Sequence, residues 1–448
     1  MSSDSDGRTQ NERLSQLNLQ LPTHVVYVLD VLEQHGYEAF LVGGCVRDTL
    51  LGIGVHDYDV ATNARPEDVQ QLFAQVIPTG LAHGTVTVTF NRLPVEVTTY
   101  RIDADYSDGR HPDKVLYANC LSDDLRRRDF TMNAIAMDKT GRVVDPMDGR
   151  RDLFCHLIRA VGNARERFAE DGLRILRALR FAAQLGFSIE DETHRAMAVE
   201  VDRLKVISME RVGQELLKIG SGNWFTVLPD LTLGPYLPAA KQPLEHLQRG
   251  LAKVHRMVRS NSKFGWDRWA RMVADQEGTW RVEPPAEWPG TPLFEPRLAA
   301  VSLWLAHMPG RSGAISNVFR PLAWPKSFVS TAVQAAVLLR SRPWTWSERT
   351  WRQTLLTSNL SALYTACALA DWMNPDEVRP ICRTRLFSVF QETPLRRVAD
   401  LALNGHQLAL LGLAGAEIGI ALHELVDAVI SETVENNEEA LRRFLLYR

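Results

Sequence analysis

The sequence predicts an α+β fold, in which a small domain with a mixed or antiparallel sheet precedes a long helical region. Residues 84–91 (GTVTVTFN) and 95–100 (VEVTTY) alternate with period two and are rich in Val, Thr and Tyr, as strands are. After residue 152 the apolar pattern is almost entirely helical. The chain has 448 residues, 45% of them hydrophobic, which is enough for about two to four domains with real cores.

The N-terminal sheet domain is expected to alternate helices and strands. A helical pattern spans 22–36, and the apolar run 39–42 predicts a strand that ends at Gly43-Gly44. The following elements are then expected in order: a helix at 45–51, a strand at 57–61, a helix at 66–73, the strands 84–91 and 95–100 with a hairpin at 91–94, a polar loop at 102–118, a helix from near Asp123, and strands at 133–137 and 143–144 around a turn at 139–141.

Prolines interrupt the helical region. Because proline lacks the backbone donor that a helix interior needs, breaks are expected where prolines occur, at Pro229, Pro235, Pro284–Pro289, Pro325 and Pro375. The chain shows no internal repeat and no low-complexity tract. The sequence therefore predicts several helical domains after the sheet domain.

Composition and charge bear on location and partners. The five cysteines form no Cys-x-x-Cys pair, the N-terminus is polar, and no apolar run is long enough for a membrane span, so we expect a soluble cytoplasmic protein with a flexible tail at 1–20. The net charge of -3 favours no partner, but residues 301–400 hold twelve Lys/Arg against six Asp/Glu. That stretch also contains Trp304, Trp324, Trp344, Trp346, Trp351 and Trp372. The stretch is either an RNA-binding surface or a helical domain with Trp in its core and Arg on its face.

The first motif with chemical meaning joins Gly43-Gly44 and Arg47 to Asp57-Tyr58-Asp59. A glycine pair between a strand and a helix lets backbone N–H groups approach a phosphate, and Arg47 can add donors to a triphosphate. Two carboxylates in Asp-x-Asp on a strand share one face, where Mg²⁺ is their natural partner for two-metal nucleotidyl transfer. Glu96, on a neighbouring strand, could supply a third carboxylate. The plainer interpretation is a chain turn and a capped loop.

Two further motifs follow. Arg126-Arg127-Arg128-Asp129 leads into a strand-like segment that includes Asn133, so at least one of the arginines could face a nucleotide rather than solvent. Asp145-Pro146-Met147-Asp148-Gly149 is either a turn that joins sheet to helices or a hinge.

Asp171 and Arg174 lie three residues apart in a predicted helix and should be neighbours on its surface. An intrahelical salt bridge is one interpretation. The other is base reading: a carboxylate accepts from an exocyclic amine and a guanidinium donates to a ring nitrogen. That polarity fits cytosine and adenine and opposes uracil and guanine, so one pair could select C and A without a template.

These motifs carry a family resemblance. LVGGCVRD, DYDVAT, EVTTYR, RRRDFTMNAIAMD, VDPMDGRRDL and EDGLRILRALRF occur in the order seen in class II tRNA nucleotidyltransferases and bacterial poly(A) polymerases. The chain looks closest to the Gram-positive CCA-adding type. The resemblance implies a polymerase-β-like head at 21–153, a neck at 154–225 for base recognition, and a body at 226–370 and a tail at 371–448 that hold tRNA.

The resemblance also implies roles for individual residues. Asp57 and Asp59 would bind Mg²⁺. From its place on a neighbouring strand, Glu96 is expected to act with them in catalysis. The nucleotide would be held by a set that we expect to comprise Gly43, Gly44, Arg47, Arg128, Asp129, Asn133, Asp171, Arg174, Arg177 and Arg180. Partners would be CTP, ATP and the 3′ end and acceptor or elbow region of tRNA, and neither DNA nor a membrane.

Four competing functions remain at this level. Poly(A) polymerases typically carry Gly-Arg-Arg-Phe-Arg where this chain reads Thr79-Gly80-Leu81-Ala82-His83-Gly84, which favours the tRNA enzyme. The others are an enzyme adding only CC or only A, a catalytically inactive RNA-binding protein, and a nucleotidyltransferase acting on a small molecule or a protein. In the family, a loop at 102–118 is associated with the switch to ATP. Here it keeps Asp105, Asp108 and Arg110 at full length, which favours complete CCA addition over CC-only.

Overall fold

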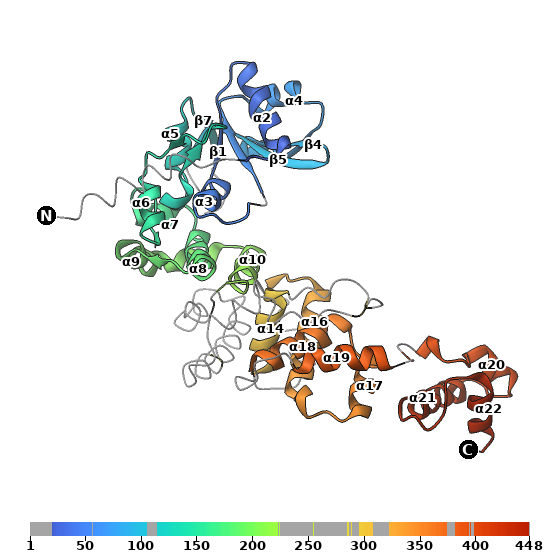
Figure 1. The fold of residues 1–448 in the computed structure, drawn as a ribbon. Coiled ribbons are helices and arrows are strands. Elements are labelled where there is room, and N and C mark those ends of the chain that lie inside the picture. Colours follow the sequence, from blue (N-terminus) through green and yellow to red (C-terminus); the bar gives the residue numbers. More distant parts are fainter. Residues whose placement is uncertain are drawn as a thin grey trace. The chain divides into compact units, whose positions relative to one another are not determined.

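The computed structural model describes residues 20–55, 57–104, 114–222, 295–307, 322–373, 381–393 and 398–447, together with residues 224, 254, 285, 288 and 395. The chain divides into two compact units, residues 1–215 and 216–448. Figure 1 shows the sheet in blue and cyan, the following helices in green, and the second unit in yellow to red.

A seven-stranded mixed sheet forms the centre of the first unit, in the order β3-β4-β5-β2-β1-β8-β9. Its strands are β1 Ala39–Val42, β2 Asp59–Thr62, β3 Val76–Gly80, β4 Thr85–Phe90, β5 Leu93–Thr99, β8 Ala136–Met137 and β9 Val143–Val144. β2 and β5 pair in parallel, and the other pairs are antiparallel. The parallel register places Asp59 opposite Glu96, so the sheet itself brings two of the predicted catalytic carboxylates onto adjacent strands.

Helices flank the sheet at defined points. α2 (Thr23–Gln34) contacts β1, β4 and β5, and buries Val25, Val28, Leu29 and Leu32, which share one helical face. α3 (Gly44–Leu50) follows β1 directly, and α4 (Pro66–Leu72) begins at a proline, which is favoured at a helix start. α5 (Leu121–Arg126) precedes the short 3₁₀ helix η2 (Thr131–Asn133). These contacts fix the ends of β1 and β2, where the predicted site residues lie.

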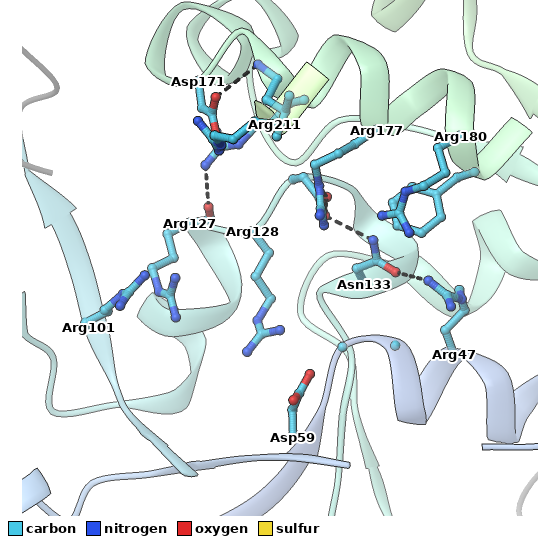
Figure 2. A pocket seen from close by; sticks show the side chains of 16 residues that line it. Arg47, Asp59, Arg101, Arg127, Arg128, Asn133, Asp171, Arg177, Arg180 and Arg211 are labelled. Atoms are coloured by element: carbon cyan, nitrogen blue, oxygen red, sulfur yellow. Dashed lines mark hydrogen bonds and ion pairs between the residues drawn. The ribbon is translucent and has the colours of Figure 1, made fainter. Parts of the chain in front are cut away.

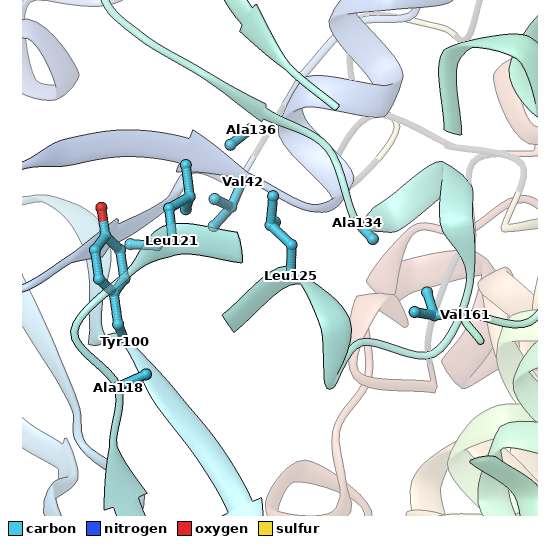
Figure 3. Packing of buried hydrophobic residues seen from close by; sticks show 9 residues of the cluster. Val42, Tyr100, Ala118, Leu121, Leu125, Ala134, Ala136 and Val161 are labelled. Carbon is cyan, nitrogen blue, oxygen red and sulfur yellow. The ribbon is translucent and has the colours of Figure 1, made fainter. Parts of the chain in front are cut away.

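A small apolar cluster joins the sheet to α5. Figure 3 shows Val42 of β1, Tyr100, Leu121 and Leu125 packed together. Tyr100, Leu125 and Ala134 are fully buried there. At about 25 cal/mol per Å² of apolar surface, burial of a side chain as large as Leu125 stabilises the fold by roughly 1.5–3 kcal/mol. The segment between α5 and β8 is thereby held against the catalytic strands.

The structure corrects several boundaries in the first unit. The predicted loop at 102–118 is partly a hairpin, since β6 (Arg101–Ala104) pairs with β7 (Lys114–Tyr117). β3 was not predicted, because its edge position leaves it largely exposed and without a clean alternation. The predicted strand at 57–61 begins at Asp59, so Asp57 precedes it. Asn133 belongs to η2 rather than to a strand.

Five helices complete the first unit and lead into the second: α6 Gly149–Phe154, α7 Ala164–Glu170, α8 Leu173–Leu185, α9 Asp191–Glu200 and α10 Met209–Ile219. The expectation of an all-helical region is slightly wrong here, because Leu157–Ile158 (β10) and Ser188–Ile189 (β11) form a short parallel pair. The first unit ends inside α10 at Glu215, before the predicted end of the neck at residue 225.

The described part of the second unit is helical, as expected. Its α-helices are α14 Pro296–Ala306, α16 Lys326–Arg340, α17 Glu348–Thr357, α18 Leu360–Met373, α19 Ile381–Glu392, α20 Gly405–Leu410, α21 Ala416–Ile430 and α22 Glu438–Leu446. Pro325 immediately precedes α16, as its predicted break requires, while Pro229, Pro235 and Pro375 lie outside the described residues. None of the described helices is both long and apolar enough to cross a bilayer.

The aromatic residues of 301–400 are mostly core residues. Trp304, Trp324, Trp351 and Trp372 are buried, whereas Trp344 is 46% exposed. The interpretation of this stretch as a helical domain with Trp in its core is therefore confirmed for these four side chains. Trp344, by contrast, lies at the surface.

Candidate active site

A cavity of about 500 Å³ opens in the first unit, beside the ends of β1 and β2. Eight arginines and three aspartates line it, a strong excess of positive charge. The charged lining residues are Arg47, Asp59, Arg101, Arg127, Arg128, Asp129, Asp171, Arg174, Arg177, Arg180 and Arg211. Figure 2 shows side chains from the sheet, from η2 and from the green helices directed into this space. Such a lining suits a ligand with several negative charges.

Asp59 forms the carboxylate end of the cavity. Burial raises the pKa of its carboxyl to about 6, with further increases from the nearby Glu96 and Asp57 charges and a partial decrease from Arg128. Asp57 and Glu96 are exposed and do not line the cavity. Among the described residues, no three His, Cys, Asp or Glu side chains are grouped closely enough to hold a metal alone. A cation here would need ligands from a substrate as well.

The glycine pair is required by close packing at the end of β1. Gly43 has φ of 76°, a conformation that L side chains rarely adopt, and an added Cβ would lie 2.9 Å from Nη1 of Arg128. Gly44 is the first residue of α3 and lines the cavity with Gly43. The backbone can therefore approach a ligand closely at this point.

The three consecutive arginines divide between solvent and the cavity. The Arg126 side chain is 65% exposed, while Arg127 and Arg128 line the cavity. Both inward guanidiniums bind Asp124, at 2.7 Å and 3.0 Å. Burial alone would raise the pKa of the Asp124 carboxyl, but these two charges outweigh burial and lower it. Nε of Arg128 is buried without a hydrogen-bond partner among the described residues.

A polar chain runs through the middle of the site. Nη1 of Arg47 donates to Oδ1 of Asn133 at 2.8 Å, and Nδ2 of Asn133 donates to Oδ1 of Asp129 at 3.0 Å. Nε of Arg177 donates to Oδ2 of Asp129 at 2.7 Å. Although burial opposes it, the Arg177 charge and the bonds from Asn133 and Arg177 lower the pKa of Asp129 to about 2. Four predicted nucleotide-binding residues are thus linked to one another.

Asp171 and Arg174 both line the cavity, but not as neighbours on one helix. Asp171 follows the last residue of α7 with extended backbone, and Arg174 lies in the first turn of α8. Asp171 binds Arg211 at 2.9 Å, whereas Arg174 binds Glu170 at 2.6 Å. The predicted helical adjacency is wrong, because the helix breaks between the two residues, and so is the salt bridge between them, since each side chain is bound elsewhere.

An aromatic ring lies among the arginines of α8. The guanidiniums of Arg47, Arg177 and Arg180 lie 5.1, 5.6 and 4.1 Å from the centroid of the Phe181 ring, within cation–π range. Arg180 also pairs with the buried Glu215 at 2.8 Å. These contacts fix Arg177 and Arg180, two of the three arginines of α8 that the sequence had suggested.

Sequence reasoning missed Arg101, Arg127, Arg211 and Phe181 as cavity-lining residues. Arg211 and Glu215 lie four apart in α10 and resemble an ordinary solvated pair, so no local pattern indicates their partners. Phe181 resembles a core residue of an amphipathic helix. Arg127 lies in the Arg run, which was expected to direct at least one member inward.

Among the described residues, 145–149, predicted as a turn or a hinge, do not line the cavity. Asp145 accepts hydrogen bonds from the backbone N of Gly149 and Arg150, both at 2.8 Å, and a Cβ on Gly149 would lie 2.1 Å from the carbonyl oxygen of Thr131. This geometry supports a tight turn at 145–149. Asp105, Asp108 and Arg110 lie outside the described residues.

The mixed sheet, with a carboxylate at the start of β2 and an arginine-lined cavity beside it, defines a nucleotidyltransferase. Residues 39–159 match the family described as Poly A polymerase head domain, and residues 186–223 match the one described as probable RNA and SrmB-binding site of polymerase A. The CCA-adding enzymes of Lactobacillus johnsonii and Geobacillus stearothermophilus are each 33% identical to this chain over 94% of its length and 96% of theirs.

A solved structure agrees with these relatives. The crystal structure of the Bacillus stearothermophilus CCA-adding enzyme in complex with CTP is 30% identical, with a TM-score of 0.76 over 96% of this chain and 98% of that one. The chain belongs to the family of CCA-adding tRNA nucleotidyltransferases. The resemblance found in the sequence is thereby confirmed.

Proposed function

We propose that this chain adds C, C and A in turn to the 3′ end of tRNA, using CTP and ATP and no template. Its relatives are named as CCA-adding enzymes, and the related crystal structure contains CTP. The observation that carries the proposal is that Asp59, Asp171 and Arg174 line one cavity; Figure 2 labels the first two. A carboxylate for nucleotidyl transfer and a donor–acceptor pair for a base edge thus face the same space.

Asp57 and Asp59 are the proposed ligands of Mg²⁺. Their chemistry fits, because hard carboxylate oxygens suit this ion and substrate phosphates commonly complete its shell. Burial and neighbouring negative charge also raise the pKa of Asp59, which is the condition that a bound cation relieves. When bound, Mg²⁺ would assist ionisation of the attacking hydroxyl and neutralise charge on the triphosphate, as in two-metal transfer.

The protein's own groups hold the nucleotide in this proposal. Arg128, Arg177 and Arg180 supply positive charge beside the triphosphate, and the backbone at Gly43 and Gly44 allows it to approach closely. The 3′ hydroxyl of the tRNA attacks the α-phosphorus, a new phosphodiester forms, and pyrophosphate leaves. Glu96, opposite Asp59 in the sheet, adds negative charge that favours the cation.

Base selection is assigned to Asp171 and Arg174. Asp171 can accept from the exocyclic amine of C or A. The described contacts of Arg174 use three of its five N–H donors, which leaves donors for a ring nitrogen. Uracil or guanine would place donor against donor and acceptor against acceptor, leaving polar groups unpaired at roughly 1–3 kcal/mol each.

The remaining domains are proposed on the same family pattern. Residues 21–153 would be the catalytic head and 154–225 the neck. The body at 226–370 and the tail at 371–448 would hold the acceptor and elbow regions of tRNA. The loop at 102–118 would act in the change from CTP to ATP.

One experiment tests the function. The protein is incubated with tRNA that ends at the discriminator base and with each labelled NTP in turn, and the product ends are sequenced. CCA ends support the proposal. Long A tracts would indicate a poly(A) polymerase, and ends at CC would indicate CC-only addition. Addition of A to CC-ended tRNA alone would indicate an A-only enzyme.

A further inference from the structure

Asn133 lies between two groups that can hydrogen-bond in one sense only. The Arg47 guanidinium only donates and the ionised Asp129 carboxylate only accepts. The Asn133 amide matches both, because its Oδ1 accepts from Arg47 at 2.8 Å and its Nδ2 donates to Asp129 at 3.0 Å. Asn133 is 5% exposed and Asp129 is 8% exposed, so water competes little with these bonds. No other orientation of the amide satisfies both neighbours.

The two neighbours belong to different parts of the site. Arg47 lies in α3, the helix that begins at Gly44. Asp129 is bound by Arg177 of α8, the helix that also carries Arg174. Figure 2 shows Asn133 between Arg47 and Arg177, with α3 below and α8 above.

Further contacts anchor the two residues on either side of Asn133, Arg47 and Asp129. Nε and Nη2 of Arg47 bind Oδ1 of Asp48 at 2.8 and 2.7 Å, so the orientation of the Arg47 guanidinium is fixed from both sides while two of its five N–H donors are left for a ligand. Asp129, which accepts from Asn133 and Arg177, also accepts from the Phe130 backbone N at 2.8 Å. The Asn133 amide is therefore the central link of a continuous polar path from α3 to α8.

We infer that Asn133 is a positioning residue, which couples Arg47 of α3, the helix that begins at the glycine pair, through Asp129 to α8, the helix that carries both the base-reading Arg174 and the triphosphate-side Arg177 and Arg180. This inference rests on the proposed function and assigns Asn133 to placing Arg47 and, through Asp129, Arg177, rather than to direct contact with the nucleotide. The position of Gly44 relative to Arg174 would then be set through four linked side chains, those of Arg47, Asn133, Asp129 and Arg177. Loss of the amide should weaken the binding of CTP and of ATP equally, because neither base is read at this position.

The test uses Asn133→Asp in the full-length chain. This change keeps the shape but places a second carboxylate against Asp129. Like charges raise the pKa of such a pair, so one proton is taken up at mildly acidic pH. The protonated carboxyl can then donate to Asp129 and accept from Arg47, as the amide does. Charged groups around this position are Asp129, Arg47 from α3 and Arg177 from α8. Arg174 and Arg180 of α8 also act electrostatically on Asp129, and Asp152 of α6 accepts from Thr131 of the same 3₁₀ helix.

KM for CTP and for ATP, and the Kd of CTP, are measured at pH 6 and pH 8.5 and divided by the wild-type values at the same pH. In that ratio the effects of groups that titrate in both proteins, such as Asp59, cancel. The expected ratio is about tenfold or more at pH 8.5 and falls towards one at pH 6. The matched control is Asn63→Asp, since Asn63 accepts from the Glu38 backbone N at the surface and should show a ratio near one at both pH values.

Asn133→Leu provides a second variant of similar size that cannot hydrogen-bond. Its KM should rise about tenfold at both pH values, with a circular dichroism spectrum like that of the wild type. A folded Leu variant with wild-type KM, or an Asp variant whose ratio does not depend on pH, would overturn the inference. If the wild-type chain adds no nucleotide to any tRNA, the proposed function fails instead, and CTP binding still tests Asn133.

Discussion

Arg211 donates from Nη2 to Oδ2 of Asp171 at 2.9 Å, from a helix forty residues further along the chain. The backbone N of Leu173 donates to Oδ1 of the same carboxylate at 3.0 Å. The carboxylate is thus held on both oxygens, and its orientation in the cavity is set by α10 as well as by the start of α8. Base selection should depend on both.

Replacing Arg211 with Ala should therefore reduce selectivity more than it reduces rate. Asp171 would keep its charge but lose one of its two anchors, so its orientation would vary. We expect kcat/KM for CTP relative to UTP to fall roughly 5- to 30-fold, equivalent to about 1–2 kcal/mol. Arg195→Ala, on the exposed side of α9, is the control and should leave that ratio unchanged. Unchanged selectivity in Arg211→Ala would show that Asp171 is positioned without it.

A second prediction concerns the pair itself. Asp171→Ala should allow UTP or GTP to be incorporated relative to CTP and ATP, because the acceptor for the exocyclic amine is lost. Arg174→Ala should reduce the incorporation of CTP and of ATP together. Incorporation of each NTP at equal concentration measures both effects. Wild-type selectivity and rate in both variants would remove the pair from base reading.

The limits of sequence reasoning are clearest at these residues. Asp171, Arg174, Arg177 and Arg180 were predicted as one helical set, and all four do line the cavity. The helix nevertheless breaks at Asp171, and the position of Arg211 depends on tertiary packing that no local pattern records. Chemical type and order along the chain therefore predicted the site, while the partners of each side chain required the structure.

Asp59→Asn should abolish addition of both nucleotides yet stabilise the metal-free protein. The folded-state pKa of Asp59 is raised from 3.8 to about 6, so its protonated form contributes stability that is fully present below pH 3.8 and is lost as the pH rises through 6. At pH 8 the substitution should raise the free energy of unfolding by up to about 3 kcal/mol, since each pKa unit corresponds to about 1.4 kcal/mol. Denaturant unfolding in EDTA at pH 8 and pH 4 measures this effect. A gain of equal size at both pH values would argue against a raised pKa.

Asp124→Asn should act in the opposite direction on stability. The neutral amide would leave Arg127 and Arg128 facing each other without their shared anion, at a fully buried position. Breaking such a buried pair costs roughly 3–5 kcal/mol. Because the folded-state pKa of Asp124 is lowered, its contribution is present above the unfolded pKa and is lost as the pH falls through the folded one. Thermal melts at pH 7 should show a lower Tm than wild type, with the difference narrowing in acid.

Other elements show why some of the fold was readable and some was not. β1 was predicted residue for residue, since a four-residue apolar run before two glycines has few other structures available. β6 and β7 were missed, because their apolar residues Ile102 and Leu116 are exposed instead of buried, and the pair is stabilised by its own ladder rather than by a core. The edge strand β3 was missed for a similar reason. Burial leaves a pattern in the sequence, and backbone pairing at an edge does not.

The last prediction concerns the segment between β6 and β7. Arg101 at the foot of β6 lines the cavity and donates to the backbone oxygen of His83, so the hairpin begins at the nucleotide site. One pocket must accept C twice and then A, and a segment attached there could reshape it as the RNA end grows. Replacing residues 105–113 with Asn-Gly, so that a two-residue turn joins the paired Ala104 and Lys114, should leave two C additions to a bare acceptor and stop before A. Sequenced product ends measure this directly, and CC-ended tRNA given ATP alone serves as the matched substrate. Efficient addition of the terminal A by this variant would exclude the segment as the switch. If the intact chain extends only CC-ended tRNA, the A-only function holds instead.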